Sequence, residues 1–231
     1  MSKHIVMLFG QPGAGKGTQA EILAEKTGYY HFESSKIIEF HIKNDETGKT
    51  YDIEGQTYKI EDEKSRWESG LLNSPPLVVF WMVEKIKELS CEGKSIIFSG
   101  SPRTVYEAEK EIPLLKHLYG AENIRFVMLE ISAETTIQRN SHRRICDLVR
   151  HSILFTPETE NLTLCPLDGS ALVKRKGLDD LETIKKRIEI YKEQTYPVAQ
   201  IIEKEGLKVN KVNGEQSPAN VHKDVFEIVK S

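Results

Sequence analysis

The sequence predicts an α/β protein in which helices wrap a parallel sheet. Two observations predict this class. Short, continuous apolar runs, each long enough for one buried strand, alternate along the chain with longer windows of helical period. The composition, with 39% hydrophobic and 29% charged residues in a chain of 231, is that of a globular protein that can bury a sizeable core.

The first predicted strand sets the pattern for the others. It covers residues 5–9, which are apolar without alternation, and it ends at a glycine-rich turn before a helical window over 17–26. A run that is apolar at every position is typical of a strand buried on both faces. Further strands are predicted at 95–98, 124–129 and 207–212, and further helices at 77–89, 105–118, 181–202 and 218–229.

Two stretches interrupt this alternation. Residues 43–68 are polar and charged, and residues 144–180 hold two of the three cysteines among several turn-forming residues. Neither stretch has a sustained helical period. We therefore expect both to be insertions that stand away from the central sheet.

Charge and cysteine content exclude several classes of protein. The chain has 32 Lys and Arg against 35 Asp and Glu, a net charge of −3, which argues against a broad nucleic-acid-binding surface. No apolar run approaches the roughly 20 residues that span a bilayer. Three cysteines cannot form a disulfide framework, so a reducing cytoplasm is the expected location. We expect no nucleic-acid or membrane partner, and nothing requires more than a monomer.

One glycine-rich segment joins the first predicted strand to the first predicted helix: Gly10-Gln11-Pro12-Gly13-Ala14-Gly15-Lys16-Gly17-Thr18. Glycines let successive backbone N–H groups turn toward an anion, and the helix N-terminus adds the positive end of its dipole. In such a phosphate loop, Lys16 reaches the outer phosphates of a nucleoside triphosphate and Thr18 joins the Mg²⁺ shell. The alternative is a glycine-rich turn without a ligand, which the spacing, the lysine and the context disfavour.

The phosphate loop alone does not distinguish GTPases, ATPases and kinases. A GTPase should carry an Asn-Lys-x-Asp motif that reads the base, but residues 210–213 read Asn-Lys-Val-Asn and lack the acid. The chain is also too short for a larger motor-type domain. Kinases of small molecules remain.

Four blocks, in order along the chain, carry a family resemblance: residues 10–19, 100–104, 139–144 and 172–187. They contain Gly-Lys-Gly-Thr-Gln, Gly-Ser-Pro-Arg-Thr, an arginine-rich segment and a second basic segment. The chain thereby resembles the adenylate kinase (nucleoside monophosphate kinase) family nearly end to end. The resemblance implies a P-loop three-layer fold with a central parallel five-stranded sheet. It also implies a core of residues 1–33, 77–143 and 181–231, an NMP-binding insertion of residues 34–76 and a lid of residues 144–180.

The same resemblance assigns site residues. It implies that ATP, with Mg²⁺ held in part by Thr18, is bound by Gly10, Gly13, Ala14, Gly15, Lys16, Gly17, Thr18, Arg139 and Arg143. The nucleoside monophosphate (NMP) is expected at Ser34, Leu72, Gly100, Arg103, Glu107 and Arg187. Catalysis is assigned to Lys16, Arg103, Arg143, Arg175 and Arg187, because phosphoryl transfer depends on neutralising spread negative charge and guanidinium groups suit that task.

These assignments imply transfer of the γ-phosphoryl group of ATP to an NMP, with AMP the favoured acceptor and GMP or dAMP the alternatives. A catalytically weak pseudoenzyme that binds ATP as a nucleotide-sensing module is a second hypothesis. It draws on three departures from the family pattern. Lys36 replaces an acid, Glu39 replaces an arginine that would hold the monophosphate, and Ser99 replaces an Asp near the Mg²⁺ waters. Glu39 is expected to be turned away or offset by Lys36 and Lys43.

Glu107 occupies the position at which many adenylate kinases read adenine with a Gln. A carboxylate only accepts hydrogen bonds, whereas an amide also donates. Glu107 could accept from the N6 amino group of adenine or from the donors of guanine, and it suits uracil poorly. The alternative is an exposed glutamate on a helix.

Cysteines in the predicted lid resemble the zinc-binding lid of part of this family. That version has two Cys-x-x-Cys pairs, of which the last member is sometimes Asp, and here the expected partner of Cys146 falls at Val149, which cannot bind a metal. His151 could substitute, which would give Cys146, His151, Cys165 and Asp168 as ligands. A structural zinc site normally has four N, S or O ligands. We therefore expect a lid held by packing alone, with structural zinc as the less favoured alternative.

Overall fold

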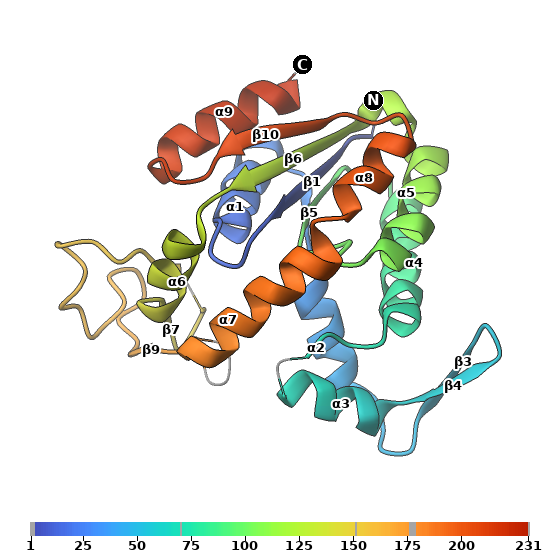
Figure 1. Cartoon of the computed structure of the whole chain (residues 1–231), viewed down its shortest axis with the longest axis horizontal. Helices are drawn as coiled ribbons and strands as arrows, with labels where there is room; N and C mark the ends of the chain where they lie inside the picture. The colour runs from blue at the N-terminus through green and yellow to red at the C-terminus, as the bar shows by residue number, and fades with distance from the viewer. Residues whose placement is uncertain (1–2, 70, 151, 176–178, 231) are drawn as a thin grey trace.

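A five-stranded parallel sheet forms the centre of the computed structural model, which describes residues 3–69, 71–150, 152–175 and 179–230 (Figure 1). The strand order is β10-β6-β1-β5-β2, and every pairing is parallel. The strands are β1 (Ile5–Gly10), β2 (Tyr30–Glu33), β5 (Ile96–Ser99), β6 (Ile124–Glu130) and β10 (Val209–Asn213). The predicted fold class and strand number are confirmed.

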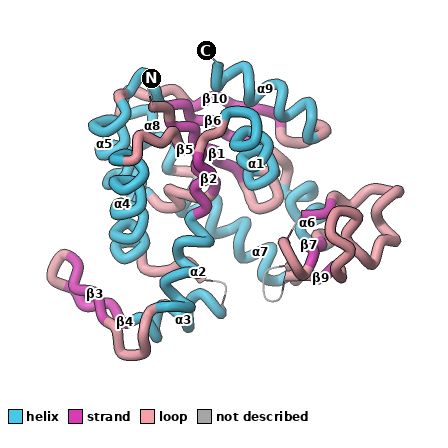
Figure 2. Tube along the Cα trace, turned by 180° about the vertical axis from the view of Figure 1, so that it is seen from behind, coloured by secondary structure: helices cyan, strands magenta, loops and turns pink. Residues whose placement is uncertain are grey.

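Helices cover both faces of this sheet, which explains why its central strands are apolar at every position. Val6 and Leu8 of β1 pack against one helical layer, and Met7 and Phe9 pack against the other. The first layer holds α1 (Lys16–Thr27) and α9 (Pro218–Lys230). The second layer holds α4 (Pro75–Cys91), α5 (Val105–Tyr119) and α8 (Val198–Lys204). Figures 1 and 2 show the two layers from opposite sides.

Two elements of the core, one strand and one helix, do not show the apolar pattern from which the other elements were predicted. Strand β2 lies at the edge of the sheet, and only Phe32 of its four residues is buried, so it lacks the apolar run of the other strands. Helix α6 (Ala133–Ser141) is mostly polar, with Thr136 and Asn140 as its buried residues. The short 3₁₀ helix η1 (Ala121–Asn123) leads into β6. These elements therefore have few buried apolar residues, and α6 buries polar side chains in their place.

The predicted helix over 181–202 is interrupted. The structure divides it into α7 (Leu181–Ile190), a π-helical turn η2 (Tyr191–Thr195) and α8. The backbone N–H of Tyr196 donates to the carbonyl of Tyr191 at 2.8 Å, which is the i to i+5 spacing of a π-turn. Pro197 follows at the N-cap of α8, where a missing N–H removes no helical hydrogen bond. The periodicity alone did not reveal this change of register.

The two expected insertions carry the two smaller sheets. One contains α2 (Ser34–Asn44), the hairpin β3 (Thr50–Ile53) and β4 (Gln56–Lys59), and α3 (Ile60–Glu68). The other contains the antiparallel strands β8 (Ser152–Ile153), β7 (Arg144–Cys146) and β9 (Leu172–Val173). Figure 2 shows the hairpin and the three-stranded sheet projecting on opposite sides of the molecule. Among the described residues, no helix combines the length and apolar character that a membrane crossing requires.

Candidate active site

The phosphate loop connects the end of β1 to the start of α1. Gly15 is the N-cap of α1 and has a φ of 91°, a left-handed conformation that glycine adopts without strain. Gly13 has a φ of 87°, and a Cβ atom there would lie 2.6 Å from Nδ2 of Asn140. That amide nitrogen donates to the carbonyl of Pro12 at 3.0 Å. The glycines therefore meet both conformational and steric requirements of this loop.

The side chain of Lys16 is held against the phosphate loop by hydrogen bonds to the backbone of that loop. Its Nζ donates to the carbonyl oxygens of Gly10 and Gln11 at 2.7 and 3.0 Å. Burial, together with the positive charges of three arginines, lowers the pKa of Lys16 to about 7. These are Arg187, Arg103 and Arg143. A cation that is destabilised by neighbouring cations is a favourable partner for a polyanion.

The arginines of this cluster come from separate segments. Arg143 follows α6 and Arg187 lies on α7, and burial lowers the pKa of each to about 10, with the charge of Arg175 as the next cause for both. Arg139 on α6 donates to the carbonyl of Gly13 at 3.3 Å, which brings it to the phosphate loop. Burial also lowers the pKa of Arg139. The fold thus brings distant predicted residues into one cationic region.

Arg175 differs from the other arginines in its partner. It forms a salt bridge with buried Asp179, with Nη2 2.5 Å from Oδ1 and Nε 3.1 Å from Oδ2. The carboxylate balances part of the positive charge that Arg175 adds to the cluster. The sequence did not reveal this pairing, although the spacing of four residues is consistent with it.

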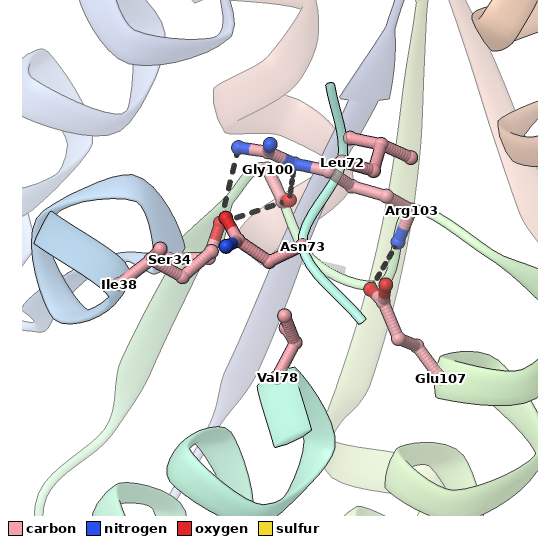
Figure 3. Close-up of a pocket in the computed structure, with 8 residues that line it drawn as sticks. All are labelled: Ser34, Ile38, Leu72, Asn73, Val78, Gly100, Arg103 and Glu107. Carbon is pink, nitrogen blue, oxygen red and sulfur yellow. Dashed lines mark hydrogen bonds between the residues drawn. The ribbon is translucent and has the colours of Figure 1, made fainter. Parts of the chain in front are cut away.

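A second group of predicted residues lines a pocket beyond the carboxyl end of β5 (Figure 3). Arg103 donates through Nε to the carbonyl of Gly100 at 2.6 Å and through Nη2 to Oγ of Ser34 at 3.4 Å. Ser34 in turn donates to Gly100 O at 2.9 Å. The lining comprises Ser34, Ile38, Leu72, Asn73, Val78, Gly100, Arg103 and Glu107. Its volume is about 10 Å³, so a nucleobase needs this pocket to widen.

Sequence reasoning missed three lining residues: Ile38, Asn73 and Val78. Ile38 lies four residues after Ser34 on α2, the spacing that places two side chains on one helical face, and this signal could have found it. Asn73 is buried, and its Nδ2 donates to the carboxylate of Glu63 at 2.9 Å. That contact joins two distant positions and has no local sequence signal.

Glu107 lies in the first turn of α5 with only 3% of its surface exposed. The interpretation of Glu107 as an exposed helix glutamate is therefore wrong. Its Oε2 accepts a hydrogen bond from the backbone N–H of Arg103 at 2.6 Å, and its backbone N–H donates to the Thr104 hydroxyl at 3.2 Å. These contacts resemble a capping box, which fixes the start of the helix.

The three departures from the family pattern have local partners. Ser99 occupies the position at which an Asp was expected. Its Oγ lies 2.7 Å from Nε2 of His31, which is on the edge strand β2. Glu39 forms a salt bridge with Lys43 at 2.5 Å. Lys43 therefore offsets the negative charge of Glu39, which was one of the two expected arrangements. Lys36 pairs instead with Glu33 and does not serve this purpose.

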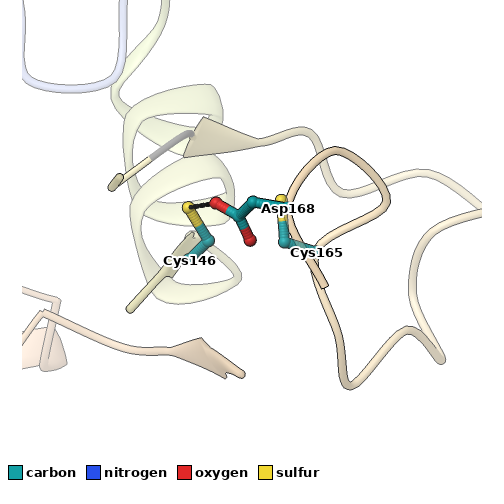
Figure 4. A group of neighbouring side chains, drawn as sticks. All are labelled: Cys146, Cys165 and Asp168. Carbon is teal, nitrogen blue, oxygen red and sulfur yellow. Dashed lines mark hydrogen bonds between the residues drawn. The ribbon is translucent and has the colours of Figure 1, made fainter. Parts of the chain in front are cut away.

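The predicted lid segment contains three candidate metal ligands that lie close together (Figure 4). The ligand atoms of Cys146, Cys165 and Asp168 lie within 4.8 Å of one another. Cys146 Sγ donates to Oδ2 of Asp168 at 3.0 Å, and this contact is the first cause of the lowered pKa of that carboxyl. The fourth candidate, His151, lies outside the described residues. The donor chemistry of the three fits zinc, which takes thiolate and carboxylate ligands.

The sheet, the phosphate loop and the converging arginines together define a class, the P-loop kinases that act on nucleoside monophosphates. A family model described as adenylate kinase matches residues 8–207. The chain therefore belongs to the adenylate kinase family.

Individual relatives agree over nearly the whole chain. An adenylate kinase of Thermotoga petrophila is 34% identical over 233 residues, covering 99% of this chain and 98% of the relative. An adenylate kinase of Caldicellulosiruptor saccharolyticus is 30% identical over 225 residues, covering 96% and 97%. One from Acetivibrio thermocellus is 31% identical, covering 96% and 95%.

Proposed function

We propose that the chain transfers the γ-phosphoryl group of ATP to a nucleoside monophosphate, with AMP as the favoured acceptor. The observation that carries this proposal is the convergence of Arg187, Arg103 and Arg143 on Lys16, whose pKa their charges lower. Arg103 also lines the pocket after β5. Phosphoryl transfer needs little covalent chemistry, and it needs positioned charge at the transferring group. The arrangement supplies that charge from one loop and three other segments.

The proposed donor site uses the phosphate loop. Its backbone N–H groups, from Gly13 through Thr18, surround the ATP phosphates, while Lys16 contacts the outer ones. Arg139 and Arg143 reach the same phosphates from α6 and from the residue that precedes β7. Mg²⁺, if bound here, would supply positive charge that neutralises the donor phosphates, and Thr18 is the residue that would help to hold it.

The chain's own contribution to Mg²⁺ is small. Thr18, in the first turn of α1, offers a hydroxyl oxygen, which is a hard ligand suited to Mg²⁺. Ser99, by contrast, offers no carboxylate and is engaged with His31. We therefore propose that phosphates and water, rather than protein carboxylates, supply most of the Mg²⁺ ligands.

The proposed acceptor site is the pocket after β5. Arg103 and Arg187 meet the acceptor phosphate, and Ser34, Leu72, Gly100 and Glu107 surround the ribose and base. Glu107 suits a purine better than uracil, which places GMP and dAMP after AMP as alternative acceptors. Arg175 joins the transferring group when it exchanges part of its contact with Asp179 for phosphate.

We also propose how the parts move. Residues 34–76 close over the acceptor and residues 144–180 close over the donor, while residues 1–33, 77–143 and 181–231 form the core. Closure excludes water, so the phosphoryl group passes to the acceptor and is not hydrolysed. We expect a monomer in a reducing cytoplasm, with no nucleic-acid or membrane partner.

A second candidate function is a nucleotide-sensing module that binds ATP without efficient transfer. The engagement of Ser99 by His31 favours it, because that position cannot help to order Mg²⁺ waters with a carboxylate. The arginine cluster around Lys16 favours transfer, since a sensing module has no need to neutralise a transferring phosphoryl group. We therefore place the kinase first.

Phosphorus NMR tests the proposal directly. Purified protein is incubated with Mg·ATP and each of AMP, GMP, CMP and UMP in turn, with a reaction lacking an acceptor and the Lys16→Ala variant as controls. We expect diphosphate signals to grow fastest with AMP and to be absent from both controls. Absence of transfer with every acceptor, while ATP still binds, would support the sensing module. Near wild-type turnover by Lys16→Ala would refute the phosphate-loop assignment.

A further inference from the structure

Glu107 combines burial with access to the acceptor pocket. It is 3% exposed and lines the pocket together with residues from α2, α4 and the segment before α4. Figure 3 shows its carboxyl group beside the backbone N–H of Arg103. An ionised carboxyl group has about four acceptor positions. The contacts with its own helix start therefore leave positions for a nucleobase.

A second acid, Glu111, lies one turn further along α5. It is fully buried, and both of its carboxyl oxygens lie 2.9 Å from the Ser101 hydroxyl. Burial, followed by the charge of Glu107, raises the pKa of Glu111 well above its usual range. Burial therefore favours the protonated, uncharged form of Glu111 beneath Glu107.

The charged groups around Glu107 are few. From the loop after β5, the guanidinium of Arg103 favours the ionised form of Glu107, and on its own helix the buried Glu111 is the other titratable group. The lining residues from the other elements carry no charge: Ser34, Ile38, Leu72, Asn73 and Val78. Burial is the largest influence and raises the pKa of Glu107, against the hydrogen bonds from the backbone and the charge of Arg103. Burial thus favours the protonated form of Glu107 more than it would for an exposed glutamate.

The two protonation states of Glu107 present different hydrogen-bonding edges. A protonated carboxyl group has one donor and one acceptor, as an amide does. This edge complements adenine, whose N1 accepts and whose N6 amino group donates. An ionised carboxylate has acceptors only, and it complements guanine, whose N1–H and N2 amino groups both donate.

We propose that the proton on Glu107 selects the purine, so that the protonated carboxyl group reads adenine and the ionised carboxylate reads guanine. This inference rests on the proposed kinase function. Glu107 is then a specificity-determining residue that changes its preference with pH, and Glu111 lies one turn behind it. A purely structural capping role would give no such dependence on pH.

The test is the ratio of kcat/KM for AMP to kcat/KM for GMP, measured between about pH 5.5 and pH 8.5. Both nucleotides carry the same phosphate and meet the same Lys16 and arginines, so their titration cancels in the ratio. For the wild type we expect the ratio to fall by about tenfold or more as pH rises, since a mismatched buried polar edge carries a penalty of that size.

Two matched variants identify the group whose protonation changes the ratio. Glu107→Gln keeps the helix cap and fixes one donor and one acceptor, so its ratio should favour AMP and stay constant with pH. Glu111→Gln makes the same substitution one turn away and should reproduce the wild-type profile. Melting temperatures of both variants establish that each is folded.

Each outcome is decisive. A wild-type ratio that is constant with pH, in an enzyme that transfers phosphate to AMP, overturns this inference and leaves the proposed function standing. A titration that disappears in Glu111→Gln but persists in Glu107→Gln also overturns it, because the proton would then belong to Glu111. Absence of transfer to either nucleotide overturns the proposed function, and this inference with it.

Discussion

At the scale of single residues, the ammonium group of Lys16 experiences two opposed environments. In the free protein, burial and neighbouring arginines lower its pKa to about 7. A bound triphosphate brings several negative charges to the same place and favours the protonated form. The free enzyme therefore holds a partly neutral lysine, whereas the complex holds a charged one.

Binding of Mg·ATP should consequently take up protons. At pH 8 we expect uptake approaching one proton, because Lys16 is mostly neutral beforehand, while Arg143 and Arg187, with pKa values of about 10, are already charged. Isothermal titration calorimetry in buffers of different ionisation enthalpy measures this uptake. Lys16→Arg, which is protonated throughout, should bind without it. A wild-type binding enthalpy that is the same in every buffer would contradict the prediction.

The sequence allowed the identity of many candidate site residues to be predicted, but not their partners. Five of the six residues expected at the acceptor, Ser34, Leu72, Gly100, Arg103 and Glu107, line one pocket, because motif spacing locates residues relative to strands and helices. Their protonation and pairing depend on contacts between distant segments. The burial of Glu107 and the salt bridge of Arg175 with Asp179 have this origin.

At the scale of helices and strands, the elements that could be predicted from the sequence were those with a clear apolar pattern. Strand β1 and helix α5 were predicted to within a residue at each end, since continuous burial or a helical stripe leaves a clear pattern. Strand β2 was not predicted because the edge of a sheet tolerates polar residues. The π-turn η2 adds one residue to a helical turn without changing composition, so no sequence pattern marks it.

The loop between β1 and α1 should be intolerant of a single methyl group. In Gly13→Ala the new Cβ would meet Nδ2 of Asn140 and would also require a left-handed conformation, which costs a non-glycine residue roughly 1–2 kcal/mol. We expect a lower melting temperature and weaker ATP binding. Gly206→Ala is the matched control, because its φ is 75° and its Cβ would enter open space. Equal effects of the two variants on ATP binding would refute the steric argument.

The three ligand atoms in the lid predict weak rather than structural metal binding. Cys146, Cys165 and Asp168 provide three of the four ligands of an ordinary structural zinc site. We expect a chelator to remove any zinc without lowering the melting temperature, and Cys165→Ser to reduce the zinc bound per chain. Metal analysis and thermal unfolding measure both effects. One tightly held zinc per chain, whose removal unfolds the lid, would show that a fourth ligand completes the site.

At the scale of the whole molecule, positive charge is concentrated in one region although the net charge is negative. The chain carries −3 overall, yet a group of half-buried cations, with Lys16 at its centre, lies at the carboxyl end of the sheet. Mutual repulsion within such a group destabilises the free protein, and a polyanion relieves that repulsion. We therefore expect an anion bound beside these cations to stabilise the molecule.

Inorganic tripolyphosphate, which lacks a base and a ribose, should raise the melting temperature. At a concentration about a hundredfold above its Kd we expect a rise of roughly 5 °C, which high salt reduces. Arg187→Gln should diminish the rise. Arg125→Gln, at the opposite end of β6 from the phosphate loop, should not. Equal rises in both variants would place the anion elsewhere on the molecule.

The π-turn between α7 and α8 has a consequence for the order of substrate addition. The Thr195 hydroxyl at its end donates to the backbone carbonyl of Arg103 at 2.7 Å, and the same helical segment carries Arg187. This hydrogen bond connects the backbone of Arg103 to the helical segment that carries Arg187. The backbone positions of the two arginines assigned to the acceptor phosphate are therefore linked in the free protein. We expect either nucleotide to be able to bind first, which initial-rate kinetics would show as a random-order scheme.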